Sequence, residues 1–187
     1  EELVGEVIRR YGDIWVREVE RLIEIDTVGA IWTGDDLAYQ TATLVSPVFL
    51  RKHIFPYYKK VSELAHSRNV PTIFHSDGDL NSILPDLIDC GIDCIHPIET
   101  DAMDIVTVKE KYGSKLCIAG NIDLMTTLSY GSPADVEAEV KQRLRQLAPG
   151  GGYVLSSSNG IADFVPPQNL IAMLKTLHRE GHYPITC

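Results

Sequence analysis

Apolar residues along the chain follow two patterns that alternate from one end to the other. The first helix is predicted over residues 13–26, where apolar side chains recur every three or four positions, and a short apolar run at 28–32 predicts a strand after it. The same two patterns predict further strands at 70–74, 93–97, 115–119 and 153–157, and helices at 46–68, 80–90, 102–112, 132–147 and 166–180. Each of the five strands is followed by a helix, which is typical of a mainly parallel α/β sheet with crossover helices.

Turn-forming residues mark the helix ends in this pattern. Two Ser-Pro pairs, at 46–47 and 132–133, combine a good N-cap with a proline at the first helical position. Pro56 predicts a bend within the helix at 46–68. Gly91 and Gly113 stand where the helices at 80–90 and 102–112 should end.

Two architectures accommodate five strand-helix units. One is a doubly wound open sheet, and the other is part of an eight-stranded barrel, which needs roughly 250 residues when complete. The pattern alone does not choose between them. No G-x-G-x-x-G follows a strand, so nothing in the sequence favours dinucleotide binding.

Composition describes an acidic globular protein. The 187 residues suit one domain, and 44% hydrophobic and 23% charged residues are enough for a real core, in which we expect Trp32, Tyr57 and Tyr58. A formal net charge of -9 argues against a nucleic-acid partner. We expect no membrane span and no signal peptide, and the chain begins as though inside a helix of a longer protein. The four cysteines fit small core residues in a reducing cytoplasm.

Polar side chains follow every predicted strand. They are Asp35 and Asp36 after the first, His75, Ser76 and Asp77 after the second, His96 and Glu99 after the third, Asn121 and Asp123 after the fourth, and Ser156 to Gly160 after the fifth. The carboxyl ends of parallel strands meet at one rim, which carries the active site in such folds. The alternative is that these residue types simply favour turns and helix caps. For all five ends together we favour a functional rim.

The pair His75-x-Asp77 is the sharpest local feature. Residues two apart in an extended segment face the same side, so the imidazole and the carboxylate can converge on one ligand. Zinc accepts this pair but needs a third protein ligand, which Asp36, Glu99 or His96 would supply. Alternatively, His75 is hydrogen-bonded to the neighbouring carboxylate in a pocket wall. Asp35 and Asp36 would bind a cation, accept a proton or cap the turn.

Other rim residues are suited to holding a substrate. Asn121 and Asp123 can bind a carboxylate or an amide, or can form an Asx-turn at the strand end. Together with Glu99 and Asn159 they are the predicted substrate-binding residues, whereas Asp35, Asp36, His75 and Asp77 are the predicted catalytic residues.

Taken as an ordered set, these motifs resemble the uroporphyrinogen decarboxylase superfamily over nearly the whole chain. The matching segments are Gly34-Asp35-Asp36-Leu37, Ser46-Pro47, Phe74-His75-Ser76-Asp77-Gly78, Gly91-Ile92-Asp93, Gly120-Asn121-Ile122-Asp123, Tyr130-Gly131-Ser132-Pro133, Gly151-Gly152-Tyr153, Asn159-Gly160-Ile161 and Pro166-Pro167-Gln168-Asn169. The resemblance implies an α/β fold of the (β/α)8 TIM type. It also implies that residues 1–187 form the C-terminal five βα units of a barrel, with the N-terminal strands missing. Barrel enzymes of this family commonly pair, so a homodimer is expected.

The superfamily holds porphyrinogen decarboxylases and zinc-dependent methyltransferases, which move methyl groups between a corrinoid protein and a thiol. This chain is closer to the methyltransferases, although Asp77 and Asn159 stand where these carry cysteines, and Asn159 also replaces a histidine of the decarboxylases. The resemblance implies a zinc ion held by His75 and Asp77, with Asp36 or Glu99, and a corrinoid protein as partner. The alternatives are a metal-free decarboxylase of a porphyrinogen or smaller acid, and a non-catalytic binding module.

Overall fold

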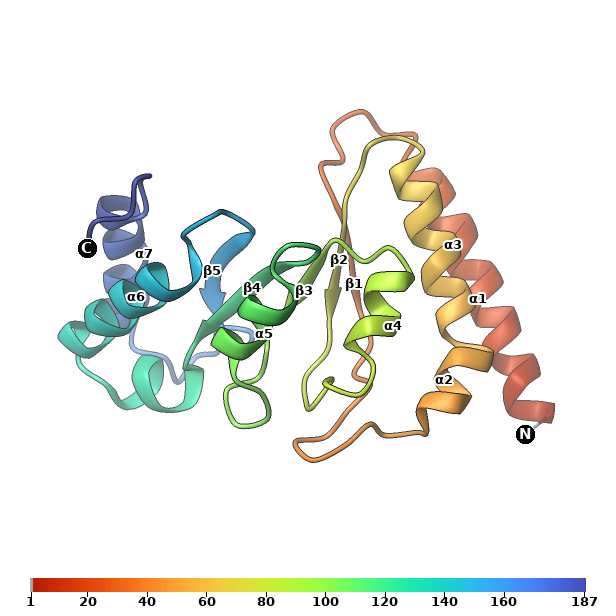
Figure 1. Cartoon of the computed structure of the whole chain (residues 1–187), viewed down its shortest axis with the longest axis horizontal. Coiled ribbons are helices and arrows are strands. Elements are labelled where there is room, and N and C mark those ends of the chain that lie inside the picture. The colour runs from red at the N-terminus through yellow and green to blue at the C-terminus, as the bar shows by residue number, and fades with distance from the viewer. Residues whose placement is uncertain (1) are drawn as a thin grey trace. The chain divides into compact units, whose positions relative to one another are not determined.

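The predicted alternation of strands and helices is present in the computed structural model, which describes residues 2–187 in two compact units that divide between Ile95 and His96 (Figure 1). The first unit contains α1 (Glu2–Leu22), β1 (Ile31–Gly34), α2 (Pro47–His53), α3 (Phe55–His66), β2 (Thr72–His75) and α4 (Leu84–Asp89). The short strand β3 (Cys94–His96) includes the boundary between the units. The second unit continues with α5 (Ile105–Tyr112), β4 (Cys117–Ile122), the π-helix η1 (Leu124–Leu128), α6 (Pro133–Leu147), β5 (Tyr153–Ser157) and α7 (Pro167–Glu180).

Each unit contains a parallel strand pair. In the first unit β1 pairs with β2 from Ile31 opposite Thr72 to Gly34 opposite His75. In the second unit β4 pairs with β5, ending with Ile122 opposite Ser157. Parallel pairing places the carboxyl ends of both strands of a pair side by side. The polar residues that follow the strands are therefore neighbours within each unit.

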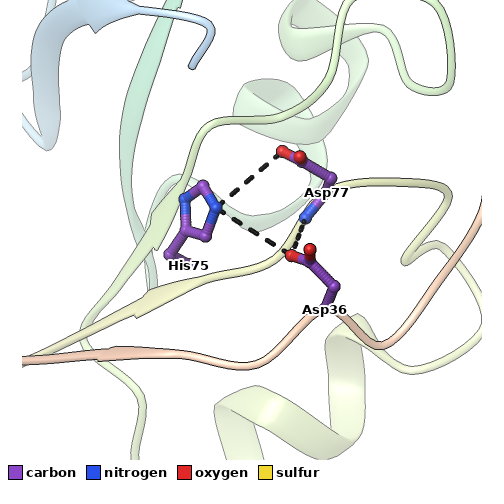
Figure 2. Close-up of side chains that lie close together, drawn as sticks. All are labelled: Asp36, His75 and Asp77. Carbon is purple, nitrogen blue, oxygen red and sulfur yellow. Dashed lines mark hydrogen bonds and ion pairs between the residues drawn. The ribbon is translucent and has the colours of Figure 1, made fainter. Parts of the chain in front are cut away.

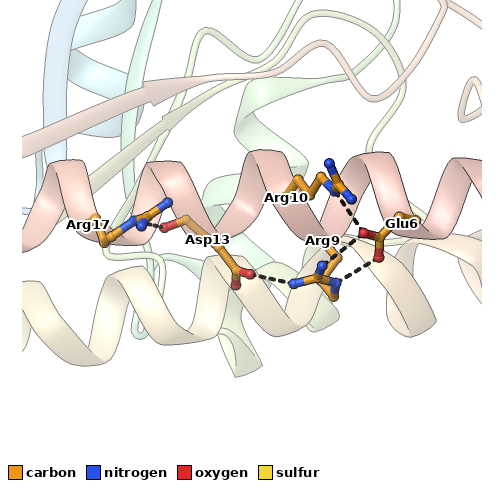
Figure 3. Close-up of polar contacts among 5 residues, drawn as sticks. All are labelled: Glu6, Arg9, Arg10, Asp13 and Arg17. Carbon is orange, nitrogen blue, oxygen red and sulfur yellow. Dashed lines mark hydrogen bonds and ion pairs between the residues drawn. The ribbon is translucent and has the colours of Figure 1, made fainter.

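The first helix begins earlier than its apolar pattern predicts, because charged residues extend it. Glu6 accepts from Arg9 and Arg10, and Arg9 also pairs with Asp13, at distances of 2.7 to 2.9 Å (Figure 3). Pairs three and four residues apart stabilise a helix without any apolar spacing. The prediction of a helix over 13–26 was therefore wrong at both ends, since α1 covers Glu2–Leu22. Within residues 2–187, no helix has the length and apolarity that a bilayer span requires.

Helix α1 packs closely on α3, and the two helices lie side by side in Figure 1. A side chain at Gly12 would collide with the ring of Tyr57, so glycine permits this close approach. The small core beneath the two helices consists of Val19, Ile31, Val61, Ala65 and Val70, with Trp15, Val16, Ile23, Val28 and Leu64 packed around it. This core attaches both helices to β1.

The three aromatic residues expected in the core differ in burial, and Tyr57 is only half-buried. Tyr58 is buried, at 3% exposure, whereas Trp32 is 56% exposed, so the prediction for Trp32 was wrong. An apolar run predicts a strand but does not say which of its positions are covered.

The predicted helix starts and breaks are largely confirmed. The Ser46 hydroxyl accepts from the backbone N–H of Phe49, and Ser132 forms a capping box with Asp135. The stretch predicted as one bent helix over 46–68 is two helices, α2 and α3, separated at Ile54, close to Pro56. The helices α6 and α7 pack together over a core of Ile122, Leu124, Leu128, Val136, Val140, Leu144, Ala148, Val165 and Met173.

Candidate metal centre

The residues with the strongest predicted chemistry lie directly after β1 and β2 in the first unit. Because Gly34 stands opposite His75, the chain leaves β1 with Asp35 and Asp36 beside the end of β2. The backbone N–H of Asp35 donates to the carbonyl oxygen of His75 at 3.0 Å, which continues the pairing one residue beyond the strands. The register of two short strands thus brings residues 35–36 and 75–77 together.

Three of these side chains converge on one point. Nε2 of His75 lies 3.9 Å from Oδ1 of Asp36 and 3.9 Å from Oδ1 of Asp77 (Figure 2). One ligand atom from each of the three residues lies within 4.8 Å of the other two. Asp36 is further held by the backbone N–H of Asp77, which donates to Oδ1 of Asp36 at 3.1 Å. The three residues have the geometry of a candidate cation site.

The spacing and the donor types suit zinc. Two ligand atoms bound to one tetrahedral zinc at its usual bond lengths stand about 3.4 Å apart. The distances of 3.9 Å therefore need to contract by only about 0.5 Å. Two carboxylates balance the charge of a divalent ion, and an imidazole is a common third ligand. Three protein ligands leave the fourth position for a substrate, as in catalytic zinc sites.

The sequence left the third ligand open, and the structure supplies a candidate. Asp36 stands with His75 and Asp77 in the same unit, whereas Glu99 and His96 belong to the second unit. The cluster is partly open, with 58% of the Asp36 side chain, 31% of Asp77 and 23% of His75 exposed. A small molecule can therefore reach the edge of the cluster, although Oδ1 of Asp77 itself is buried. Metal binding itself stays a prediction.

Asp35 has a different environment from its neighbour Asp36. The hydroxyl of Tyr58 donates to Oδ2 of Asp35 at 2.7 Å. Burial, and then the charge of Asp35, raise the pKa of this phenol, so Tyr58 keeps its proton and remains a donor. No local pattern predicts this pair, because Tyr58 lies on α3, 23 residues away from Asp35.

A cavity of about 340 Å³ adjoins Asp35 in the first unit. It lies between α1, β1 and α3, and its wall includes the aromatic side chains of Trp15, Trp32, Tyr57 and Tyr58. Its described lining contains no lysine or arginine. Such a wall suits an apolar or aromatic group better than a substrate that carries several carboxylates.

The predicted substrate-binding residues all belong to the second unit, and two of them hold the backbone there. Asn121 is buried and its Nδ2 donates to the carbonyl oxygen of Ile98 at 2.7 Å. Asp123 caps η1 by accepting from the backbone N–H of Thr126 at 2.8 Å, which is the turn alternative that the sequence allowed.

The other two residues lie in loops of the second unit. Oδ1 of Asn159 accepts from the backbone N–H of Gly160 at 2.7 Å, and Asn159 is exposed. Glu99 is half-buried, and its backbone carbonyl accepts from Ala102 and Met103. A role in substrate binding stays a prediction for all four residues.

The sequence of the chain is similar to those of known proteins from one family. The family model described as uroporphyrinogen decarboxylase (URO-D) matches residues 1–180. The chain is 28% identical over 145 residues to a uroporphyrinogen decarboxylase of Chlorobaculum tepidum, covering 75% of the chain and 40% of that protein. It is also 28% identical over 173 residues to the methylcobamide:CoM methyltransferase MtaA of Methanosarcina barkeri, covering 88% of the chain and 49% of that protein.

The chain is also similar in fold to a solved structure. A methyltransferase from Methanosarcina mazei matches 91% of the chain with a TM-score of 0.73 and 25% sequence identity. The match confirms the predicted fold class, since that protein is of the TIM-barrel type and only 48% of it is covered. The chain thus spans about half the length, or less, of the relatives described here.

Proposed function

The chain belongs to the uroporphyrinogen decarboxylase family, and from this premise we propose that it serves methyl transfer to a thiol acceptor, with Asp36, His75 and Asp77 as the ligands of a zinc ion. The family includes both decarboxylases and methyltransferases among the relatives of this chain. The observation that carries the proposal is the convergence of one imidazole and two carboxylates at the ends of β1 and β2. The methyl donor is proposed to be a corrinoid on a partner protein, as the name of the methylcobamide-dependent relative suggests.

The three side chains would have different roles in binding the zinc ion. A bound zinc ion lowers the pKa of a coordinated thiol, so that the thiolate is available for attack on a methyl group. His75 would bind the ion through Nε2, the ring nitrogen that faces both carboxylates. Asp36 is kept in place by the N–H of Asp77, and this bond orients one ligand by means of the other.

The ligand set has a consequence for affinity. Carboxylates bind zinc less strongly than thiolates do, and Asp77 stands where the methyltransferases resembled by this chain carry a cysteine. We therefore expect a zinc centre that exchanges its metal more readily than a thiolate site. A carboxylate carries the same charge as a thiolate but donates less electron density to zinc, which would favour ionisation of the substrate thiol.

The test is the zinc content of the purified chain and of two variants, His75→Ala and Asp77→Ala. The control is His66→Ala, because Nε2 of His66 also lies against a carboxylate, at 2.8 Å from Asp93 in the same unit, but outside the cluster. We expect one zinc per chain in the unmodified protein and in the control, and little in the two cluster variants. Equal zinc content in all four proteins would refute the proposed ligand set.

The second candidate function is decarboxylation of a small carboxylic acid, favoured by the similarity to uroporphyrinogen decarboxylases. In this reaction Asp35 or Asp36 would stabilise a cationic intermediate and His75 would transfer a proton. The lining of the cavity next to Asp35 argues against a substrate as rich in carboxylates as a porphyrinogen. Release of CO₂ that survives a strong chelator would favour this function over the zinc-dependent one.

A further inference from the structure

The two loops that carry the proposed ligands are bonded to each other along their length. The N–H of Asp35 donates to the carbonyl of His75 at 3.0 Å, and the N–H of Asp79 donates to the carbonyl of Tyr39 at 2.8 Å. Between these two bonds the loops also approach closely at Gly78. Its φ of +88° is one that side chains rarely allow, and a Cβ there would collide with the backbone of Ala38.

Ser76 is in the middle of this contact and is 1% exposed. Its hydroxyl oxygen accepts from the backbone N–H of Leu37 at 3.0 Å, and the hydroxyl donates to the backbone carbonyl of Asp77 at 3.0 Å. One hydroxyl thus binds the peptide group directly after Asp36 and the peptide group of Asp77. It connects the backbones of two proposed ligands without touching their carboxylates.

We infer that Ser76 is a positioning residue that sets the distance between Asp36 and Asp77, and through it the metal affinity of the centre. The inference rests on the proposed function, because it assigns Ser76 a role at that centre. Leu37 is itself buried, so its N–H has no ready alternative to the serine hydroxyl. Loss of the hydroxyl would make the loops separate or turn until the N–H reaches water, and Asp36 would move with Leu37.

The experiment compares zinc affinity in Ser76→Ala and Ser62→Ala by competition with a coloured chelator. Ser62 is a matched control, since it is also 1% exposed and in the same unit, and its hydroxyl has no hydrogen-bond partner among residues 2–187. Groups around metal ligands typically change affinity roughly 10- to 100-fold, so we expect a loss in this range for Ser76→Ala and no change for Ser62→Ala. Equal affinities in the two variants would overturn the inference.

A second readout does not need the metal. The amide hydrogen of Leu37 should exchange with solvent at least about 10-fold faster in Ser76→Ala than in the unmodified chain or in Ser62→Ala, because its acceptor has been removed. If the unmodified chain binds no zinc but Leu37 shows this exchange pattern, the proposed function fails and the bond between the loops stands. If zinc binds and Leu37 exchanges equally in all proteins, the role of Ser76 fails and the proposed function stands.

Ser76→Thr tests the role of the hydroxyl even if the alanine variant does not fold. Threonine retains the hydroxyl, so this variant should recover most of the zinc affinity and the slow exchange of Leu37. The assignment would be contradicted if the threonine variant folds but binds zinc as weakly as the alanine variant. If the alanine variant does not fold, the assignment would be contradicted by a threonine variant that binds zinc much more weakly than the unmodified chain.

Discussion

The ends of the β1–β2 pair and of the β4–β5 pair carry the same kinds of residue but use them differently. After β1 and β2, the side chains of Asp36, His75 and Asp77 face one another. At the end of β4, the side chains of Asn121, which lies within the strand, and Asp123, which follows it, bind backbone groups. Aspartate and asparagine at a strand end are therefore ambiguous until their partners are known. Side chains that converge on one another indicate a site, even where one of them also accepts from a backbone N–H, as Asp36 does. Side chains whose contacts are with backbone groups, as for Asn121 and Asp123, indicate a structural role.

The largest effect should come from exchanging one carboxylate in each region for an amide. Asp36→Asn removes a proposed charged ligand, and zinc affinity should fall by more than the roughly 10- to 100-fold typical of groups around the ligands. Asp123→Asn is the matched control in the second unit, and it should leave zinc affinity unchanged. Isothermal titration of both variants with zinc measures the difference. A similar loss in both variants would remove the distinction between the two regions.

A smaller effect is expected when the side chain that binds the backbone in the second unit is removed. Asn121→Ala leaves the buried carbonyl of Ile98 without its donor, which should lower the free energy of unfolding by about 1–3 kcal/mol. Zinc affinity should not change. Urea unfolding measures the loss, and an unchanged midpoint would show that the bond does not stabilise the unit.

Each region also contains a tyrosine whose titration gives a pH dependence, and Tyr58 is buried whereas Tyr153 is partly buried. Burial raises the pKa of Tyr58 in the first unit and of Tyr153 in the second. Above about pH 10 the unfolded chain loses both phenolic protons while the folded chain keeps them, so stability falls as pH rises, by up to about 1.4 kcal/mol per pH unit for each group.

The variants Tyr58→Phe and Tyr153→Phe separate the two contributions. Each should reduce the fall in unfolding free energy between pH 9 and pH 11, measured in urea, because one titrating group is lost. Each variant also removes a hydrogen bond, from Tyr58 to Oδ2 of Asp35 or from Tyr153 to the carbonyl oxygen of Gly120. Both should therefore lower stability at pH 7, and Tyr58→Phe should do so more because its acceptor is a carboxylate. If the unfolding free energies do not depend on pH in this range, the pKa values of Tyr58 and Tyr153 are not raised in the folded chain.

The smallest effect is expected on the surface of α1, away from both strand ends. Hydrogen bonds from Arg9 and Arg10 lower the pKa of Glu6 to about 2. Because this pKa is lowered, the contribution of Glu6 to the stability of the folded chain is complete above about pH 4.5 and is lost as pH falls toward 2. Glu6→Gln should remove this contribution and otherwise change little, because exposed ion pairs stabilise weakly. Helix content by circular dichroism between pH 5 and pH 2 compares the two proteins, and a large difference at pH 7 would contradict a weak surface role.

The sequence predicted the α/β fold because each strand-helix unit leaves a local signal. Strand 153–157 was predicted at its observed bounds, whereas β4 extends to Ile122, beyond the predicted end at 119, because polar Asn121 ended the apolar run without ending the strand. The start of α1 was missed because charge pairs, rather than apolar spacing, form its first turns. The exposure of Trp32 was missed because a local pattern does not say what covers a strand.

For the candidate site, the sequence predicted residues but not their partners. Asp36 and His75-x-Asp77 were candidates because they follow strands, and the register of β1 and β2 explains why they meet. The hydrogen bonds of Tyr58 and Ser76 join residues 23 and 39 positions apart, and no local pattern carries that information.

The most direct test of the proposed centre is X-ray absorption at the zinc edge of the zinc-loaded chain. We expect a zinc coordination shell of nitrogen and oxygen only, at about 2.0–2.2 Å, with the scattering signature of one imidazole that disappears in His75→Ala. A sulfur shell at about 2.3 Å, or an imidazole signature that persists without His75, would contradict it.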